Sequence, residues 1–271
     1  MPSRFSPTGP QRIVCLTEEP TEILCALGER ERIVGISAYT VRPKDIRSDK
    51  PVVSAYLDGS LSKISALEPD LVVGFSDIQG DLAAKLIKAH LPVLIFNQRS
   101  VEEIFEVIYT LGGIVGAAEK TDVLLVSYRR NIEEAEAKAR TLSRRPRIYF
   151  EEWDEPTISG IEWVSELIEI AGGDDVFAAM SKNKGAADRQ PTAEAILEAN
   201  PDIIIACWCG KPVDKEALCQ RPGFDGLNAV RDNMVFEMDP SIILQPGPAA
   251  LTDGLAELSR IVEVWDKEQT A

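Results

Sequence analysis

The sequence predicts an α/β protein of two similar lobes, each with a mainly parallel sheet, because one pattern occurs twice. Residues 66–74 (ALEPDLVVG) and 198–206 (EANPDIIIA) each leave a helix and pass through Pro-Asp into an apolar run. The apolar strands that begin at Arg12 and Arg147 each run into acidic residues, a Pro-Thr pair and an amphipathic helix. These two pairs are offset by 132 and 135 residues. Two facing lobes would enclose a cleft, where we expect the function to lie.

Composition excludes several classes of protein. The chain has 271 residues, 45% of them hydrophobic and 27% charged, as in folded soluble proteins. Its net charge of −15 argues against a nucleic-acid partner, because phosphate binding uses clustered lysine and arginine. No window approaches the roughly 20 apolar residues of a membrane span.

The N-terminus and the cysteines bear on the compartment. Residues 1–10 lack the apolar core of a signal peptide, and we expect them to form a disordered lead-in. Five cysteines without regular spacing fit a reducing compartment. The sequence as it stands predicts a cytoplasmic protein, or a periplasmic or cell-surface protein if an export signal has been removed.

The N-terminal lobe is expected over residues 11–100. Its apolar runs are separated by helical segments, and this alternation predicts a parallel sheet. The expected strands are 12–16, 33–37, 51–55, 71–75 and 92–96, and the expected helices are 20–28, 61–68 and 81–90. Gly28 is placed to end the first helix.

Residues 101–142 are predicted to form one long linking helix. Helical periodicity persists over 101–139, although Gly112 and Gly113 cost about 1 kcal/mol each relative to alanine and could bend it. A helical link resists large closure, so ligand binding should move the lobes only slightly.

The C-terminal lobe, residues 143–271, repeats the scheme. Expected strands are 147–152, 202–207 and 235–239, and expected helices are 161–171, 191–199, 225–230 and 248–265. The fold class is therefore two Rossmann-like lobes joined by one long backbone helix.

This pattern resembles the helical-backbone (class III) substrate-binding proteins of ABC importers, in the cobalamin and iron-siderophore branch, and is most similar to the cobalamin-binding proteins. The matching segments are 12–37, 64–74, 158–173 and 193–205, which with the linking helix cover nearly the whole chain. The resemblance implies docking on an ABC permease through one glutamate per lobe. That position is Glu194 in the second lobe, whereas the first lobe has Ser62.

Ligands of open parallel sheets bind beyond the carboxyl ends of the strands. This rule selects the candidate ligand-binding residues, with Trp163 added at the start of a helix. They are Glu18, Tyr39, Tyr56, Phe75, Asp77, Glu152, Trp153, Trp163, Trp208, Cys209 and Gln245.

Aromatic residues make up only 6% of the chain, yet five follow strands: Tyr39, Tyr56, Phe75, Trp153 and Trp208. Flat amphipathic rings suit a large planar ligand, although each could instead pack under a loop. In the cobalamin binders, positions resembling Tyr39, Tyr56 and Phe75 face the corrin ring.

Three further features allow two interpretations each. Trp163 lies on an apolar helix face, either in the core or at the cleft rim. The acidic run 151–155 could accept hydrogen bonds from corrin amides or bind a cation, or simply favour a nearby helix N-terminus. Cys207 and Cys209 share a strand face, but a zinc site needs about four ligands, so we predict no metal site and leave Cys219 as a possible third ligand.

The only histidine, His90, ends a helix opposite the predicted cleft, which disfavours Ser-His-Asp and Cys-His catalysis. We therefore predict a monomeric, non-catalytic protein that binds cobalamin or another corrinoid as ligand. One alternative is a siderophore or metal-chelate binder of an ABC importer. Another is a cytosolic enzyme or chaperone acting on a tetrapyrrole-like substrate through Cys209, Glu151 and Asp154.

Overall fold

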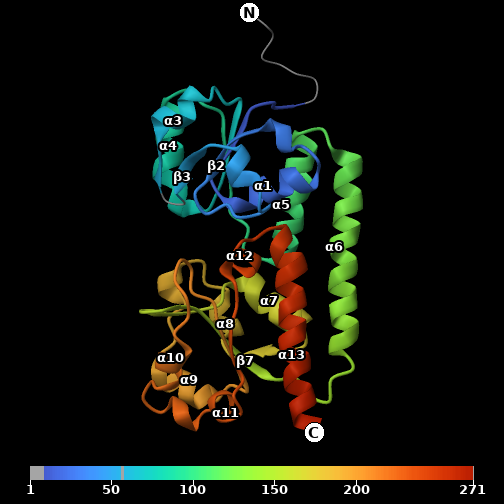
Figure 1. Ribbon diagram of the computed structural model, residues 1–271, viewed down its shortest axis with the longest axis vertical. Helices are drawn as coiled ribbons and strands as arrows, with labels where there is room; N and C mark the ends of the chain where they lie inside the picture. The colour runs from blue at the N-terminus through green and yellow to red at the C-terminus, as the bar shows by residue number, and fades with distance from the viewer. Residues whose placement is uncertain (1–8, 56–57, 271) are drawn as a thin grey trace, which may run out of the picture. The chain divides into compact units, whose positions relative to one another are not determined.

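The computed structural model describes residues 9–55 and 58–270 (Figure 1). It confirms an α/β fold with mainly parallel sheets. The chain divides into two compact units. Unit 1 comprises residues 1–98, 102–128 and 245–248, and unit 2 comprises residues 99–101, 129–244 and 249–271. The predicted domain limits at residues 100 and 142 stay predictions.

Unit 1 is built on a sheet with strand order β4-β3-β2-β1-β5-β6. The strands are β1 (Ile13–Cys15), β2 (Ile33–Ser37), β3 (Val52–Ala55), β4 (Asp58–Gly59), β5 (Leu71–Phe75) and β6 (Val93–Phe96). All neighbours pair in parallel except β3 with β4. The central strand β1 is fully buried, because apolar side chains cover both of its faces.

Short helices cover this sheet: α1 (Glu18–Ala26), α2 (Ile46–Asp49), α3 (Leu61–Ala66), α4 (Gly80–Lys88) and the 3₁₀ turns η1 (Arg30–Arg32) and η2 (Asp77–Gln79). Figure 1 shows α3 and α4 side by side, and Ile64, Leu82 and Leu86 from them join Val14 and Val72 in one apolar cluster. Gly28 ends the first helical segment at φ +75°, as predicted.

The predicted single helix over 101–142 is wrong, because the segment forms two helices, α5 (Val101–Ile114) and α6 (Ala118–Ala139). The break follows Val115, at Gly116 with φ +72°. Gly112 belongs to the packing of the two helices, since a Cβ there would lie 1.9 Å from Thr121 Oγ1. At about 1.5 Å per residue, α6 alone is roughly 33 Å long. Its residues up to Tyr128 belong to unit 1, and those from Arg129 belong to unit 2.

Unit 2 has the strand order β11-β10-β7-β8, with β9 also paired to β7. The strands are β7 (Arg147–Asp154), β8 (Thr157–Ser159), β9 (Asp174–Asp175), β10 (Ile203–Ala206) and β11 (Val235–Glu237). Strand β8 runs antiparallel to β7, and the other pairs are parallel.

The α-helices of unit 2 are α7 (Glu162–Ile170), α8 (Ala178–Ser181), α9 (Ala193–Ala199), α10 (Lys215–Cys219), α11 (Asn228–Arg231), α12 (Pro240–Ile243) and α13 (Leu255–Thr270). The unit also contains the 3₁₀ turns η3 (Ala186–Asp188) and η4 (Phe224–Gly226) and the π-helical turn η5 (Ala250–Gly254). The predicted closing helix thus begins with η5 and continues as α13. The helix expected at 225–230 is η4 followed by the single turn α11.

The repeated Pro-Asp element has the same role in both units. The Asp70 carboxylate accepts the backbone N–H of Arg12 at 2.8 Å, and the Asp202 carboxylate accepts that of Arg147 at 3.0 Å. Each aspartate therefore anchors the start of the neighbouring central strand, β1 or β7. The helix before it ends in both copies with a residue at positive φ, Glu68 or Asn200.

The two docking positions implied by the resemblance are also equivalent. Ser62 and Glu194 are each the second residue of their helix, α3 or α9. The N-cap hydroxyls of Ser60 and Thr192 accept the backbone N–H three residues on, at 3.3 and 3.2 Å. Both Ser62 and Glu194 are exposed.

Within residues 9–55 and 58–270, no helix is both long enough and apolar enough to cross a bilayer.

Candidate functional site

The predicted residues of unit 1 follow strands that end at one edge of its sheet. Strand β1 lies between β2 and β5, with Ile13 opposite both Ile33 and Leu71. Because these strands are parallel, the segments after Cys15, Ser37 and Phe75 leave from the same edge. Tyr56, another predicted residue, lies outside the described residues.

The side chains at this edge differ in exposure. Tyr39 is 49% exposed, whereas Phe75 is 4% exposed. Asp77 is exposed, and its carboxylate accepts the Ser76 hydroxyl at 2.8 Å. Gln245 is half-buried in the short segment 245–248 that belongs to unit 1.

Two carboxyl groups are buried directly after β1, at the N-terminus of α1. Glu18 is 8% exposed and Glu19 is 1% exposed. Among the described residues, no well-formed hydrogen bond reaches Glu18 Oε2 or either carboxyl oxygen of Glu19. Gly247 lies against Glu19, since a Cβ at this glycine would be 3.0 Å from the Glu19 Cβ.

This burial changes the ionisation of both groups. Burial raises the pKa of Glu18 to about 7. It raises the pKa of Glu19 to about 8, where the Glu18 charge adds to the effect and the Thr17 hydroxyl offsets only part of it. Near neutral pH the pair therefore retains protons, and can donate as well as accept hydrogen bonds.

In unit 2, the fully buried carboxylate of Glu151 joins three elements. It accepts hydrogen bonds from both Nη groups of Arg221, at 2.5 and 2.9 Å. It also accepts one from the Trp208 indole N–H at 3.0 Å and one from the Tyr149 hydroxyl at 2.9 Å. Such a set of donors balances the cost of burying the charge. Glu151 therefore fixes the orientation of Trp208 and is occupied as an acceptor, which disfavours its use as a catalytic base.

The next acid, Glu152, is held in the same way by Arg189, whose side chain is 3% exposed. The two groups lie 2.7 Å apart, and Arg189 Nη1 also donates to the backbone carbonyl of Ser159. The predicted ligand-binding residue Glu152 is therefore held within unit 2 by its ion pair with Arg189.

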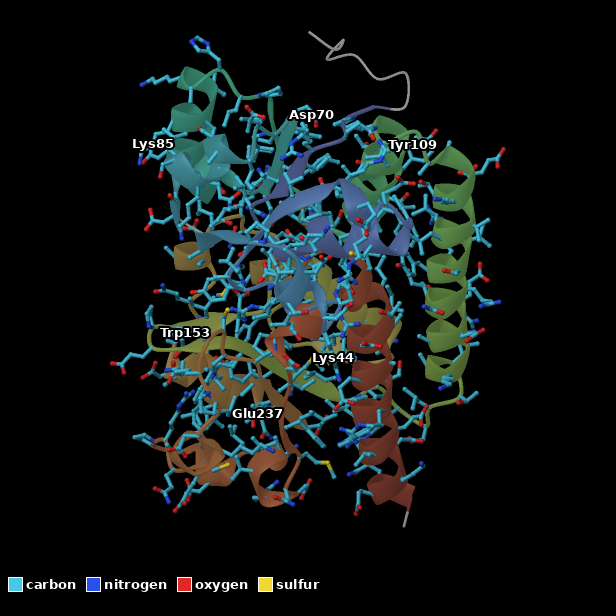
Figure 2. All side chains as sticks on the ribbon, turned by 45° about the horizontal axis from the view of Figure 1, so that its top comes forward. Lys44, Asp70, Lys85, Tyr109, Trp153 and Glu237 are labelled. Atoms are coloured by element: carbon cyan, nitrogen blue, oxygen red, sulfur yellow. The ribbon has the colours of Figure 1, made fainter. Side chains whose placement is uncertain are left out.

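Trp153 and Trp208 come together at the edge where β7 and β10 end, and the ammonium of Lys211 lies over both rings. Lys211 Nζ is 4.5 Å from the Trp153 ring centroid and 4.9 Å from that of Trp208. It also forms a 2.6 Å ion pair with Asp154 Oδ1. Partial burial raises the pKa of Asp154, but the paired Lys211 ammonium lowers it, and the net shift is downward. We call Trp153, Trp208 and Asp154 the aromatic cage, and Figure 2 marks Trp153 near the end of β7.

The structure distinguishes the remaining predicted residues of unit 2. Trp163 is 3% exposed and its indole N–H donates to the backbone carbonyl of Ile243 at 2.8 Å, so it packs in the core of its unit. Cys209 is exposed. Cys207 is buried, and this burial raises its pKa well above the usual value.

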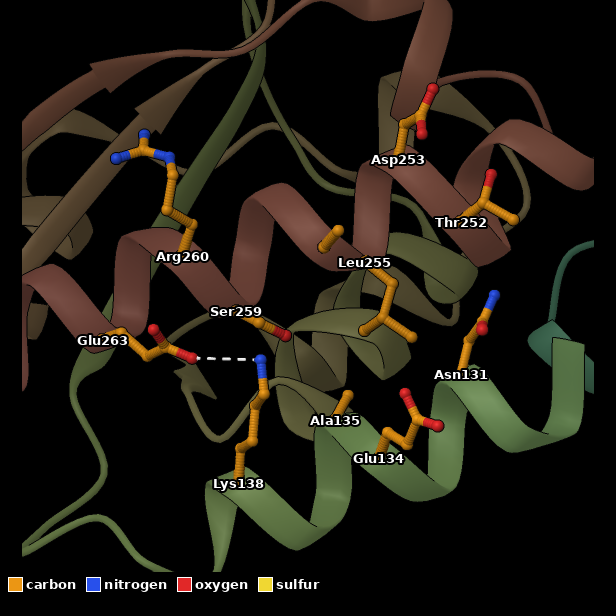
Figure 3. A pocket seen from close by; sticks show the side chains of 11 residues that line it. Asn131, Glu134, Ala135, Lys138, Thr252, Asp253, Leu255, Ser259, Arg260 and Glu263 are labelled. Atoms are coloured by element: carbon orange, nitrogen blue, oxygen red, sulfur yellow. Dashed lines mark ion pairs between the residues drawn. The ribbon is translucent and has the colours of Figure 1, made fainter.

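Among the described residues, no group of three or more His, Cys, Asp or Glu side chains is placed to hold a metal ion. A pocket of about 550 Å³ adjoins the aromatic cage and is lined by Trp208, Lys211, Lys215, Glu237, Met238, Asp239 and Pro240. Another, of about 330 Å³, lies between α6 and α13, where Lys138 and Glu263 pair at 3.3 Å (Figure 3). Because it lies along two helices and away from the strand ends, we do not assign it to the candidate site.

Sequence reasoning missed Lys211, Arg221 and Arg189. Lys211 lies in a glycine-proline loop with no recognisable motif, and its position over the two rings depends on how that loop folds back. Arg221 is 70 residues from its partner Glu151. Glu19 is a further residue at a strand end that lies outside the predicted set. Two adjacent acids directly after an apolar strand were the signal that could have identified it.

Comparison with known proteins shows to which family the chain belongs. The chain is 28% identical, over 93% of its length and 80% of the relative's, to an uncharacterized ABC transporter substrate-binding lipoprotein of Bacillus subtilis. It is 25% identical, over 89% of its length and 86% of the relative's, to the vitamin B12-binding protein of Vibrio parahaemolyticus.

The periplasmic heme-binding protein RhuT of Roseiflexus sp. RS-1 has the same fold. Its TM-score is 0.78 at 23% identity, over 94% of this chain and all of that one. The sequence model of the periplasmic binding protein family matches residues 13–242. The chain therefore belongs to the periplasmic binding protein family, whose members are solute-binding proteins.

Proposed function

We propose that this chain is the substrate-binding protein of an ABC importer and that its ligand is cobalamin or a related corrinoid. The observation that carries the proposal is the chemistry at the strand ends. Unit 1 carries Tyr39 and the buried carboxyl groups of Glu18 and Glu19 at its strand ends, and unit 2 carries the rings of Trp153 and Trp208 at its own. A corrinoid is a large flat ring edged with amides, so it matches both kinds of group.

The carboxyl groups also favour a corrinoid over an anionic ligand. An amide side chain donates and accepts hydrogen bonds and carries no charge, so it can reach buried carboxyls without repulsion. The carboxylates of a heme, or the oxygen donors of a ferric chelate, would be repelled by the fraction of Glu18 and Glu19 that is ionised. Relatives named for vitamin B12 and for an ABC transporter lend independent support.

The remaining predicted contacts belong to the same proposal. Phe75, Asp77 and Cys209 contribute at the strand ends, and Gln245 contributes from the segment that follows α12. Glu152 and Trp163 support neighbouring residues from within unit 2. The ligand is bound without chemical change. We place the protein on the outer side of the cytoplasmic membrane, since a similar protein is a lipoprotein.

A panel of ligands tests the proposal. Purified protein is titrated with cyanocobalamin, hemin and a ferric hydroxamate, with tryptophan emission and the visible bands of the ligand as readouts. We expect saturable binding of cyanocobalamin at concentrations where the other two do not bind. Preferential binding of hemin or the ferric chelate would overturn the corrinoid assignment while leaving the importer role intact.

A further inference from the structure

The aromatic cage is already occupied by a side chain of this protein. Lys211 Nζ lies over the rings of Trp153 and Trp208, at 4.5 and 4.9 Å from their centroids, and pairs with Asp154 at 2.6 Å. Two indole faces and one carboxylate form a cage suited to an alkylammonium cation. We propose that Lys211 is an internal occupant of this cage and that the ligand displaces it on binding.

The burial of Trp208 agrees with this role. Its ring follows strand β10 at the edge where ligands of such sheets bind, yet it is only 4% exposed. One side packs in the core of unit 2 with Tyr149 and Phe224, and the Lys211 ammonium lies over the ring. Displacement of Lys211 would therefore uncover an indole surface held in place by Glu151.

Lys211 can also leave the cage readily. Its side chain remains 39% exposed, so the ammonium can move into water without crossing the core. It follows Gly210, whose φ of +83° permits a tight loop. The cation–π contacts and the ion pair of a partly exposed lysine are each weak, so the occupied state is favoured only modestly.

This inference rests on the proposed function. Its measurable consequence is that Lys211 lowers the affinity of the wild-type protein for its ligand. A ligand that needs the cage can bind only the fraction of molecules from which Lys211 has moved. Removing the side chain should therefore tighten ligand binding by about three- to tenfold. Lys211 would thus tune affinity from inside the site.

The test compares wild type with Lys211→Ala and with Lys184→Ala, which removes an exposed charge elsewhere on unit 2. Without ligand, we expect acrylamide to quench tryptophan emission more strongly in Lys211→Ala than in the other two proteins. Adding n-propylammonium chloride should reverse this quenching in Lys211→Ala but leave wild type unchanged. Cyanocobalamin should bind Lys211→Ala about three- to tenfold more tightly than wild type, and should bind Lys184→Ala as it binds wild type.

Two results would overturn the proposal. One is equal acrylamide quenching in wild type and Lys211→Ala, which would mean that Lys211 does not cover the rings. The other is weaker cyanocobalamin binding by Lys211→Ala, which would make Lys211 a ligand contact. If no protein of the set binds cyanocobalamin, the proposed ligand is wrong, while the quenching and n-propylammonium experiments still decide whether Lys211 occupies the cage.

Discussion

At the scale of single residues, the buried acids after β1 make stability depend on pH. Glu18 and Glu19 have pKa values of about 7 and 8 in the folded protein, against 4.5 without burial. A carboxyl whose pKa rises on folding holds its proton more tightly in the folded state. The stability that these two groups contribute therefore falls as pH rises from about 4.5 to about 8, and this loss is complete above that range.

Glu19→Gln should remove most of the Glu19 contribution, because the amide carries no charge at any pH. We expect the variant to be more stable than wild type at pH 8 by roughly 1–3 kcal/mol and nearly equal to it at pH 5. Urea unfolding followed by tryptophan fluorescence between pH 5 and 8 measures this. Glu31→Gln, at an exposed position, serves as the control. An unchanged pH slope in Glu19→Gln would contradict this account.

Glu151 should be among the most sensitive residues of unit 2. Glu151→Gln removes the charge that pairs with Arg221, and we expect it to cost about 2–4 kcal/mol. Tyr149→Phe removes one neutral donor to the same carboxylate and should cost about 1 kcal/mol. Chemical denaturation measures both losses of stability. If Glu151→Gln costs no more stability than Tyr149→Phe, the Glu151 charge does not have the stabilising role inferred here.

At the scale of elements, the two adjacent glycines of α5 should respond oppositely to alanine. A methyl group at Gly112 would lie 1.9 Å from Thr121 Oγ1 on α6, so Gly112→Ala should destabilise the protein by about 1–3 kcal/mol. Gly113 has nothing within 4 Å of the added carbon, so Gly113→Ala should be neutral or stabilising by up to about 1 kcal/mol. Melting temperatures compare the two, and equal effects would contradict the packing argument.

These elements also show how much of the fold can be predicted from the sequence. The runs IVGIS and LVVGF predicted β2 and β5 residue for residue, because buried parallel strands leave a continuous apolar signature. The break between α5 and α6 was missed because both sides have helical periodicity. What separates them is a left-handed Gly116 and the seating of Thr121 against Gly112, which is a tertiary contact.

The candidate site was predictable only as a set of strand ends. Trp153 and Trp208 could be placed at one edge, because parallel strands end together. Their neighbour Lys211 could not, since its position depends on a loop that folds back over both rings. Likewise, the sequence pointed to acids near 151, but not to the arginine that neutralises Glu151 from 70 residues away.

At the scale of the whole molecule, the internal repeat is equivalent in backbone but not in charge. Ser62 and Glu194 occupy the same position of α3 and α9, after matching N-caps. If docking on a permease uses these positions, Glu194→Gln should reduce ligand uptake several-fold while Ser62→Ala has little effect. Uptake in cells that depend on this protein, with ligand affinity measured in parallel, tests this. Equal losses from both variants would show that the charge asymmetry is irrelevant.

The central claim is that this chain binds a corrinoid, and isothermal titration with cyanocobalamin tests it most directly. We predict a saturable heat at about one ligand per chain, together with a shift of the visible bands of the corrinoid. The absence of both the heat and the band shift, with cyanocobalamin and with several other corrinoids, would contradict the claim.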